Sequence, residues 1–151
     1  MNSEPKLIPI DGLTVAGFSV RTMNKDEFKP ETAKLPELWG RFASSGLMKG
    51  QTAVYGVYSD YESDASGFYT VTAGIPLSSS LDGEYETVSI LPGHYLVFSD
   101  KGPMPQTVVQ IWERVWNYFT ENKGYKRNFF SDFELYTSEE DVAVYIGIIT
   151  S

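Results

Sequence analysis

The chain has 151 residues, of which 42% are hydrophobic and 15% aromatic, and this length fits one domain with its own core. Asp and Glu (20) outnumber Lys and Arg (12), and the net charge of −8 argues against direct nucleic-acid binding. The lack of Cys excludes disulfides, thiolate nucleophiles and Cys-ligated zinc. With no long apolar run and no signal peptide, we expect a cytoplasmic protein without membrane contact, metal or cofactor.

The first half of the chain predicts one helix among three strands. The expected elements are a strand around Thr14–Val20, a charged connection over 24–30, a helix, and strands at Thr52–Tyr58 and Phe68–Ile75. The helix is indicated by apolar residues at helical spacing, namely Leu35, Leu38, Trp39 and Phe42. Pro36 is tolerated only in a first turn, so the helix begins near Lys34, and Gly46 is its expected C-terminal cap.

The second half predicts the clearest helix of the chain, together with four strands. The expected strands are Glu86–Ile90, Tyr95–Ser99, Phe129–Tyr136 and Val142–Ile149. The helix opens at Pro105 and has one apolar stripe made of Val108, Ile111, Trp112, Val115, Trp116 and Phe119. Lys123 and Gly124 are typical of its C-terminal end.

The two halves share the order strand, helix, strand, strand. Residues 37–42 (Glu-Leu-Trp-Gly-Arg-Phe) match residues 110–115 (Gln-Ile-Trp-Glu-Arg-Val) within the two helices. The prediction is an α+β fold of two pseudo-symmetric βαββ repeats, about 7–76 and 77–151, within a single domain 1–151. The repeats would form one antiparallel sheet with two helices and a concave ligand pocket at their junction.

The strand Phe129–Tyr136 carries the most informative charge, Glu134. Side chains alternate along a strand, so Glu134 and Tyr136 share one face while Phe133 and Leu135 point to the other. If Phe133 and Leu135 face the helices, Glu134 lies on the opposite face. A Glu among aromatics needs a cation or solvent, and the equally frequent alternative is an exposed position on an edge strand.

Alignment of the two repeats shows which residue of the first half is equivalent to this acid. The strand after each helix ends in a tyrosine, Tyr58 in one half and Tyr136 in the other. Aligning these tyrosines sets Gly56 against Glu134. One half would then supply the charge and the other an absent side chain, which leaves room.

Aromatic residues and one histidine are the remaining candidates for a site. Tyrosines combine an apolar ring with a polar tip and suit a pocket; they are Tyr55, Tyr58, Tyr69 and Tyr136. Trp39, Trp112 and Trp116 lie on apolar helix stripes, where tryptophans are more often core than ligand platforms. His94 favours a surface or turn role over haem ligation or general-base catalysis. Asp132 is either a second charge or a cap at the strand end.

Several segments, in this order, resemble the GyrI-like effector-binding family of bacterial multidrug-responsive regulators and their stand-alone relatives on integron cassettes. They are Leu38-Trp39, residues 58–61 (Tyr-Ser-Asp-Tyr), residues 67–74 (Gly-Phe-Tyr-Thr-Val-Thr-Ala-Gly), residues 92–95 (Pro-Gly-His-Tyr) and residues 132–136 (Asp-Phe-Glu-Leu-Tyr). The resemblance implies a pseudo-symmetric fold with an aromatic pocket. Its acid, on the penultimate strand, pairs with lipophilic cations and matches Glu134.

The same resemblance implies roles for other residues. Tyr69 matches a pocket aromatic, Trp39 a helix position that lines the cavity, and Tyr136 a neighbour of the acid. The regulators carry a helix-turn-helix region before this domain, and too few residues precede the first strand here to hold one. The chain therefore resembles the sensor domain alone, with no DNA-binding domain.

The predicted function is a stand-alone binding protein for lipophilic cationic or aromatic compounds, modulating transcription or sequestering drugs. The candidate ligand-binding residues are Glu134, Tyr136, Tyr69, Trp39, Tyr58 and Trp112, and no catalytic residue is assigned. One alternative is a small-molecule hydrolase in which Glu134 activates water. Another is a modulator whose acidic surface engages a transcription regulator or other basic protein. Haem binding through His94 ranks last.

Overall fold

The computed structural model describes residues 5–27, 29, 31–46, 53–62, 67–76, 85–103, 106–121, 125–138 and 140–149. The strands are β1 (Lys6–Ile10), β2 (Leu13–Thr22), β3 (Val54–Ser59), β4 (Tyr69–Pro76), β5 (Glu86–Ile90), β6 (Gly93–Lys101), β7 (Arg127–Tyr136) and β8 (Asp141–Ile148). The helices are α1 (Asn24–Glu27), α2 (Leu35–Ser45) and α3 (Gln106–Thr120). Every predicted strand and both predicted helices are present, and β1 and the single turn α1 are additions.

All eight strands form one antiparallel sheet in the order β1-β6-β8-β7-β3-β4-β2-β5. Four neighbouring strands belong mainly to each half of the chain, and the halves meet where β7 pairs with β3. Each repeat also begins with a strand that pairs across the boundary: β1 with β6 and β5 with β2. The repeats are therefore ββαββ units that exchange their first strands, which extends the predicted α+β arrangement.

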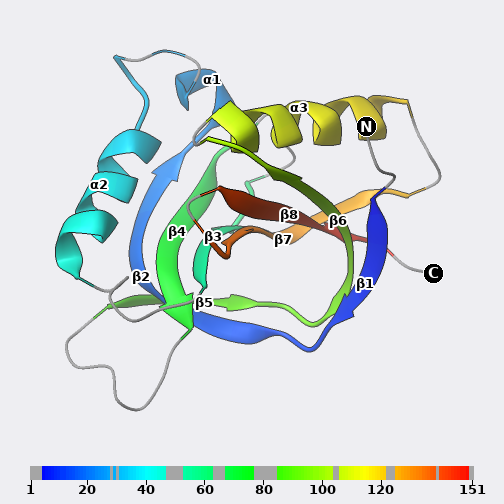
Figure 1. Cartoon of the computed structure of the whole chain (residues 1–151), viewed down its shortest axis with the longest axis horizontal. Helices are drawn as coiled ribbons and strands as arrows, with labels where there is room; N and C mark the ends of the chain where they lie inside the picture. Colours follow the sequence, from blue (N-terminus) through cyan, green and yellow to red (C-terminus); the bar gives the residue numbers. More distant parts are fainter. Residues whose placement is uncertain are drawn as a thin grey trace.

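The exchanged strands curve the sheet. The pairing of β1 with β6 runs from Lys6 opposite Val97 to Ile10 opposite Gly93. It resumes in the same register between β2 and β5, from Leu13 opposite Ile90. The chain therefore runs side by side with itself from Lys6 to Gly17 and from Glu86 to Val97, and the sheet bends round on itself (Figure 1). Few strand edges remain unpaired, which protects against edge-to-edge aggregation.

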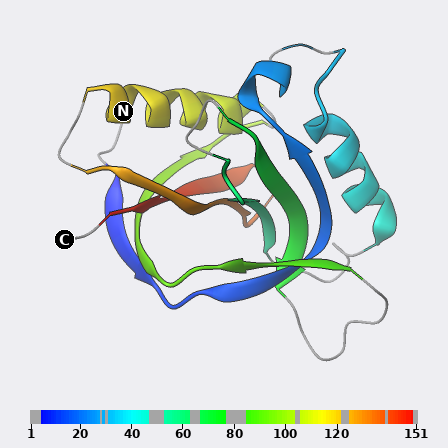
Figure 2. The same ribbon diagram turned by 180° about the vertical axis from the view of Figure 1, so that it is seen from behind.

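The two faces of the sheet have separate cores. One face is covered by α2 over the first half and by α3 over the second (Figures 1 and 2). Leu38 and Phe42 of α2, and Ile111 and Val115 of α3, are fully buried there. The residues under α2 and those under α3 form two hydrophobic clusters on this face. The other face encloses a third cluster, made of Val15, Val57, Ile90, Tyr95 and Phe133. Because these residues come from five strands, the sheet wraps around them.

Helix α2 begins and ends where its sequence indicates. Pro36 lies in the first turn, and Gly46 adopts a left-handed conformation with φ of 82° at the C-terminal cap. The N-terminus is capped from the turn before it, because the Glu27 carboxylate accepts the backbone N–H groups of Lys34 (2.9 Å) and Leu35 (3.1 Å). Helix α1 thus positions a carboxylate at the positive end of α2.

Strand β7 corrects one expectation about its faces. Phe133 is buried in the third cluster, with Leu135 packed against it, so both point away from the helices. Glu134 therefore faces α2 and α3 rather than the opposite side. The alternation itself holds. The faces are the reverse of the supposed ones because the curved sheet builds a second core, and that core takes the apolar face of β7.

Candidate ligand-binding site

Glu134 lies at the junction of the two repeats. Strand β7 pairs there with β3, and Gly56 is the direct cross-strand partner of Glu134. The repeat alignment and the strand pairing thus single out the same two positions, so the pseudo-two-fold axis passes between them. Strand β7 has neighbours on both sides and Glu134 is only 4% exposed. This excludes the alternative of an exposed Glu on an edge strand.

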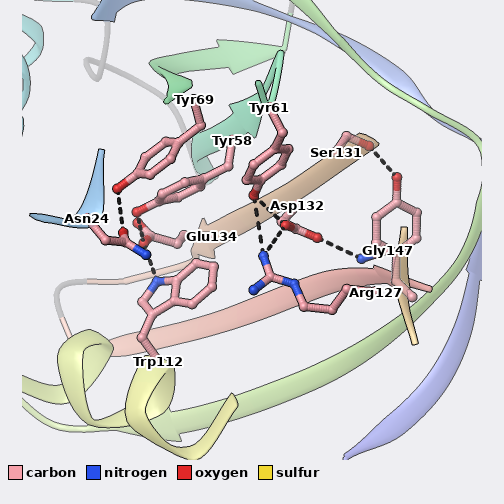
Figure 3. Close-up of polar contacts among 11 residues, drawn as sticks. Asn24, Tyr58, Tyr61, Tyr69, Trp112, Arg127, Ser131, Asp132, Glu134 and Gly147 are labelled. Carbon is pink, nitrogen blue, oxygen red and sulfur yellow. Dashed lines mark hydrogen bonds and ion pairs between the residues drawn. The ribbon is translucent and has the colours of Figure 1, made fainter. Parts of the chain in front are cut away.

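Three side chains donate hydrogen bonds to the Glu134 carboxylate, and Figure 3 shows the two from Tyr58 and Trp112. Oε2 accepts from the Tyr58 hydroxyl at 2.8 Å and from the Trp112 indole Nε1 at 2.7 Å. Oε1 accepts from the Tyr136 hydroxyl at 2.7 Å. The donors come from β3, α3 and β7, so both halves of the chain contribute. Hydrogen bonds to a charged acceptor are stronger than neutral ones, which helps to hold this buried group.

Equivalent residues of the two repeats lie on either side of the Glu134 carboxylate, related by the pseudo-two-fold axis. Tyr58 and Tyr136, which the repeats align, donate to different carboxylate oxygens. Trp112 lies on the Oε2 side, and Trp39 lies on the Oε1 side above Gly56. A Cβ atom at Gly56 would come within 2.9 Å of Trp39 Cζ2 and 3.1 Å of Glu134 Oε1. The room left by the glycine is therefore taken by the indole of Trp39 and by the carboxylate.

Electrostatics make this carboxylate unusual. Burial raises the pKa of Glu134 above its ordinary value, and the hydrogen bonds from Tyr136, Trp112 and Tyr58 offset only part of that shift. Burial also raises the pKa values of Tyr58 and Tyr136 well above 10, so both hydroxyls keep their protons and act as donors. Among the described residues no ion pair involves Glu134. Within the described part of the chain, the site is thus a buried acid whose charge is not balanced by a cationic side chain.

Two residues farther up β7, Asp132 is balanced. Its Oδ2 forms an ion pair with Arg127 Nη2 at 2.7 Å and accepts a hydrogen bond from the Tyr61 hydroxyl. Its Oδ1 accepts the backbone N–H of Gly147 at 2.9 Å. The side chains of Arg127 and Asp132 are 8% and 0% exposed. The sequence analysis missed Arg127, because the chain crosses a register irregularity in β7 before the two groups can meet.

The other candidate residues take different places. Tyr69 donates to Asn24 Oδ1 at 2.7 Å, not to Glu134, although its ring lies 5.4 Å from that of Tyr58. Tyr55 packs against the third cluster on the far face of the sheet, so it is not part of this site. The ring of Trp116 is next to that of Trp112, with the two ring centroids 6.4 Å apart. His94 is exposed on β6.

The cluster of Glu134, Tyr58, Trp112, Tyr136, Trp39 and Gly56, hereafter the carboxylate cage, surrounds the Glu134 carboxylate with aromatic side chains. A surface hollow of about 470 Å³ lies instead on the other face of β7, lined by residues that include Leu135, Ala143 and Tyr145. Within the described ranges, no group of three or more His, Asp or Glu side chains could hold a metal ion. In that same part of the chain, no helix is long and apolar enough to cross a membrane.

The same fold occurs in proteins of known structure. The integron cassette protein VCH_CASS2 of Vibrio cholerae is 38% identical, with a TM-score of 0.89 over 98% of this chain and 97% of that one. SAV2435, solved bound to tetraphenylphosphonium, is 20% identical and shares the fold, with a TM-score of 0.76 over 97% and 94% of the two chains.

Sequence relatives point the same way. YobU of Bacillus subtilis (strain 168), named as a candidate transcriptional regulator protein, is 31% identical over 130 residues, which are 80% of this chain and 79% of YobU. Residues 6–148 match the Cass2 family, described as integron-associated effector binding protein. The chain belongs to this family of effector-binding proteins. The resemblance seen in the sequence is thereby confirmed.

Proposed function

We propose that the chain binds lipophilic aromatic cations and that the Glu134 carboxylate is their counter-charge. The observation that carries the proposal is a carboxylate, 4% exposed, that accepts three hydrogen bonds and has no cationic partner among the described residues. Burying an unpaired charge is costly, and a bound cation would offset that cost. The tetraphenylphosphonium complex of SAV2435, which has the same fold, adds support.

The aromatic members of the cage supply the second part of recognition. Tyr58, Trp112 and Tyr136 present rings around one carboxylate. Each ring face can attract a cation by on the order of 0.5–2 kcal/mol, and more when water is excluded. Such attraction depends weakly on the shape of the ligand. We therefore propose a broad range of flat or globular aromatic cations rather than one metabolite.

We also propose that residues 1–151 act as one binding unit, because the two repeats share a sheet and contribute jointly to the cage. Capture of a cation could then serve either to sequester it or to change contacts with a transcription regulator or other basic protein. The formal charge of −8 is compatible with such a partner. Localisation in the cytoplasm is part of the same proposal.

Calorimetric titration with three probes tests whether binding requires a positive charge. The probes are the cation tetraphenylphosphonium, its anionic counterpart tetraphenylborate and the neutral triphenylphosphine oxide. We expect Glu134→Gln to weaken the phosphonium by about 10- to 100-fold, which is about 1.4–2.8 kcal/mol, and to change the neutral probe by less than about 3-fold. Glutamine fits the site, because its carbonyl can accept from Tyr58 and Trp112 while its amide donates to the Tyr136 oxygen.

A matched control removes one negative charge elsewhere. Glu113 is exposed on α3, next to Trp112 in the chain, so Glu113→Gln changes the net charge by the same amount. We expect it to leave phosphonium binding within about 2-fold, because exposed charges are screened by solvent and salt. Equal losses for the cation and the neutral probe in Glu134→Gln would contradict the proposed charge pair.

A further inference from the structure

The two oxygens of Glu134 are not equally occupied. Oε2 accepts hydrogen bonds from both Tyr58 and Trp112, whereas Oε1 accepts one, from Tyr136. Each carboxylate oxygen has two lone pairs that can accept in the plane of the group. Oε1 therefore retains accepting capacity. A cation that approaches Oε1 need not displace any of the three donors.

The two tryptophans of the cage are also held differently. Trp112 donates a 2.7 Å hydrogen bond to Glu134, and its ring lies 5.1 Å from that of Tyr58. Trp39 is held by ring contacts, edge-on to Phe42 at 5.9 Å and to Tyr136 at 5.4 Å. Moving Trp112 would break a charge-assisted hydrogen bond, whereas moving Trp39 would cost only packing. The Oε1 side is thus the side that can open.

Gly56 lies beneath the Oε1 side of the cage. Its φ is not positive, unlike those of Gly12, Gly46, Gly93 and Gly102, so an ordinary residue would suit its backbone conformation. What the glycine provides is space, because a Cβ there would meet both Trp39 and the carboxylate. The space already holds the edge of an aromatic ring, because Cζ2 and Cη2 of Trp39 lie 2.9 and 3.4 Å from the position of that Cβ.

We propose that the space above Gly56 is a subsite for one aromatic group of the cation, which takes the place of the Trp39 indole beside Glu134 Oε1. The inference rests on the proposed function and assigns it a location and an orientation. The charged centre lies against Oε1, one aryl group lies flat on the Gly56 backbone, and Trp112 stays hydrogen-bonded to Oε2. Gly56 then determines how large an aromatic group the cage accepts.

The test measures tetraphenylphosphonium binding by calorimetry to four variants: Gly56→Ala, Trp39→Ala, the double variant, and Trp112→Ala. Gly56→Ala is expected to weaken binding by about 10-fold or more, because the methyl group occupies the floor of the subsite. Trp39→Ala is expected to bind about as tightly as the wild type or up to about 10-fold more tightly, since nothing has to be displaced. Trp112→Ala is expected to lose about 10-fold or more.

The double variant separates the subsite from a simple packing effect. The added methyl group cannot clash with Trp39 once the indole is gone, so the double variant also guards against misfolding of Gly56→Ala. If the ligand occupies the subsite, Gly56→Ala weakens binding by the same factor in the Trp39→Ala background. If its effect vanishes there, Gly56 only positions Trp39 and the subsite is overturned. Tetramethylammonium, which has no aryl group, should be insensitive to Gly56→Ala.

The outcomes also keep the two proposals apart. Wild-type protein that fails to bind tetraphenylphosphonium would overturn the proposed function, and the subsite with it. Binding that depends on Glu134 but tolerates Gly56→Ala would leave the proposed function standing and overturn the subsite alone. A loss in Trp39→Ala larger than that in Trp112→Ala would also overturn it, because the ligand would then depend on the indole that we infer it replaces.

Discussion

Asp132 and Glu134 lie two residues apart on the same face of β7, and both are buried, at 0% and 4% exposure. Asp132 is paired with Arg127 and bound by Tyr61 and a backbone N–H. In the described ranges, the donors to Glu134 are all neutral. The comparison teaches that burial by itself does not mark a binding site. What marks it is burial without an internal counter-charge, because such a site gains most when a cation arrives from outside.

The largest effect is expected at the paired acid. Asp132→Asn should lower the free energy of unfolding by about 3–5 kcal/mol, because it removes the carboxylate that is paired with the buried guanidinium of Arg127. Urea denaturation measures the loss. Glu134→Gln is the matched substitution and should change the stability by less than about 1 kcal/mol. Similar losses in both variants would show that Glu134 is also structurally paired.

Proton binding sharpens the comparison next. Because the pKa of Glu134 is raised in the folded protein, only its deprotonated form can pair with a cation. Below that raised pKa, tetraphenylphosphonium affinity should fall by about tenfold per pH unit, while binding of triphenylphosphine oxide stays constant. Calorimetry across the pH range measures this. A flat profile for the cation would contradict the role of Glu134.

The same shift predicts a stability trend of definite sign. The folded protein holds the Glu134 proton more tightly than the unfolded chain, whose ordinary value is 4.5. This tighter binding of the proton stabilises the folded state. The stabilisation is fully present below the pKa of the unfolded chain and is lost as the pH rises through the raised pKa of the folded state. The wild type should therefore lose stability relative to Glu134→Gln on going from about pH 4 to pH 8. Parallel curves for the two proteins would contradict the shift.

The smallest expected effect is that of removing a single tyrosine hydroxyl from either acid. Tyr58→Phe removes one donor to Glu134, and Tyr61→Phe removes one donor to Asp132. Each should cost about 1 kcal/mol of stability. Only Tyr58→Phe should move the acid limb of tetraphenylphosphonium binding to higher pH, because it weakens the stabilisation of the charged carboxylate. An equal displacement in Tyr61→Phe would contradict the assignment of the acid limb to Glu134.

Local patterns in the sequence were sufficient for much of the fold. The spacing of apolar residues located α2 and α3, Gly46 marked the end of α2, and the alternation along β7 put Glu134 and Tyr136 on one face. Repeat alignment matched Gly56 with Glu134, and the structure adds that these two residues are cross-strand partners. These features depend on neighbours in the chain or on internal similarity, which a single sequence contains.

Other features depend on segments that meet only in three dimensions. The periodicity of apolar residues in the sequence does not predict that β1 pairs with β6 or that Arg127 contacts Asp132, because both contacts depend on the register between strands. Tyr69, the expected pocket residue, bonds to Asn24 of α1, an element too short to show a helical pattern. Such contacts are chosen by the packing of the whole sheet rather than by local propensity.

The sequence by itself determined the elements, the repeat and the position of the acid, because side-chain periodicity and turn residues act over a few residues. The tertiary structure alone decided which face of β7 meets the helices, because the curved sheet builds a second core that claims Phe133 and leaves Glu134 toward α2 and α3. It also decided that Asp132 has a cationic partner and that Glu134 has none among the described residues. That difference comes from where distant side chains converge, and it is what makes one of two similar acids the candidate binding group.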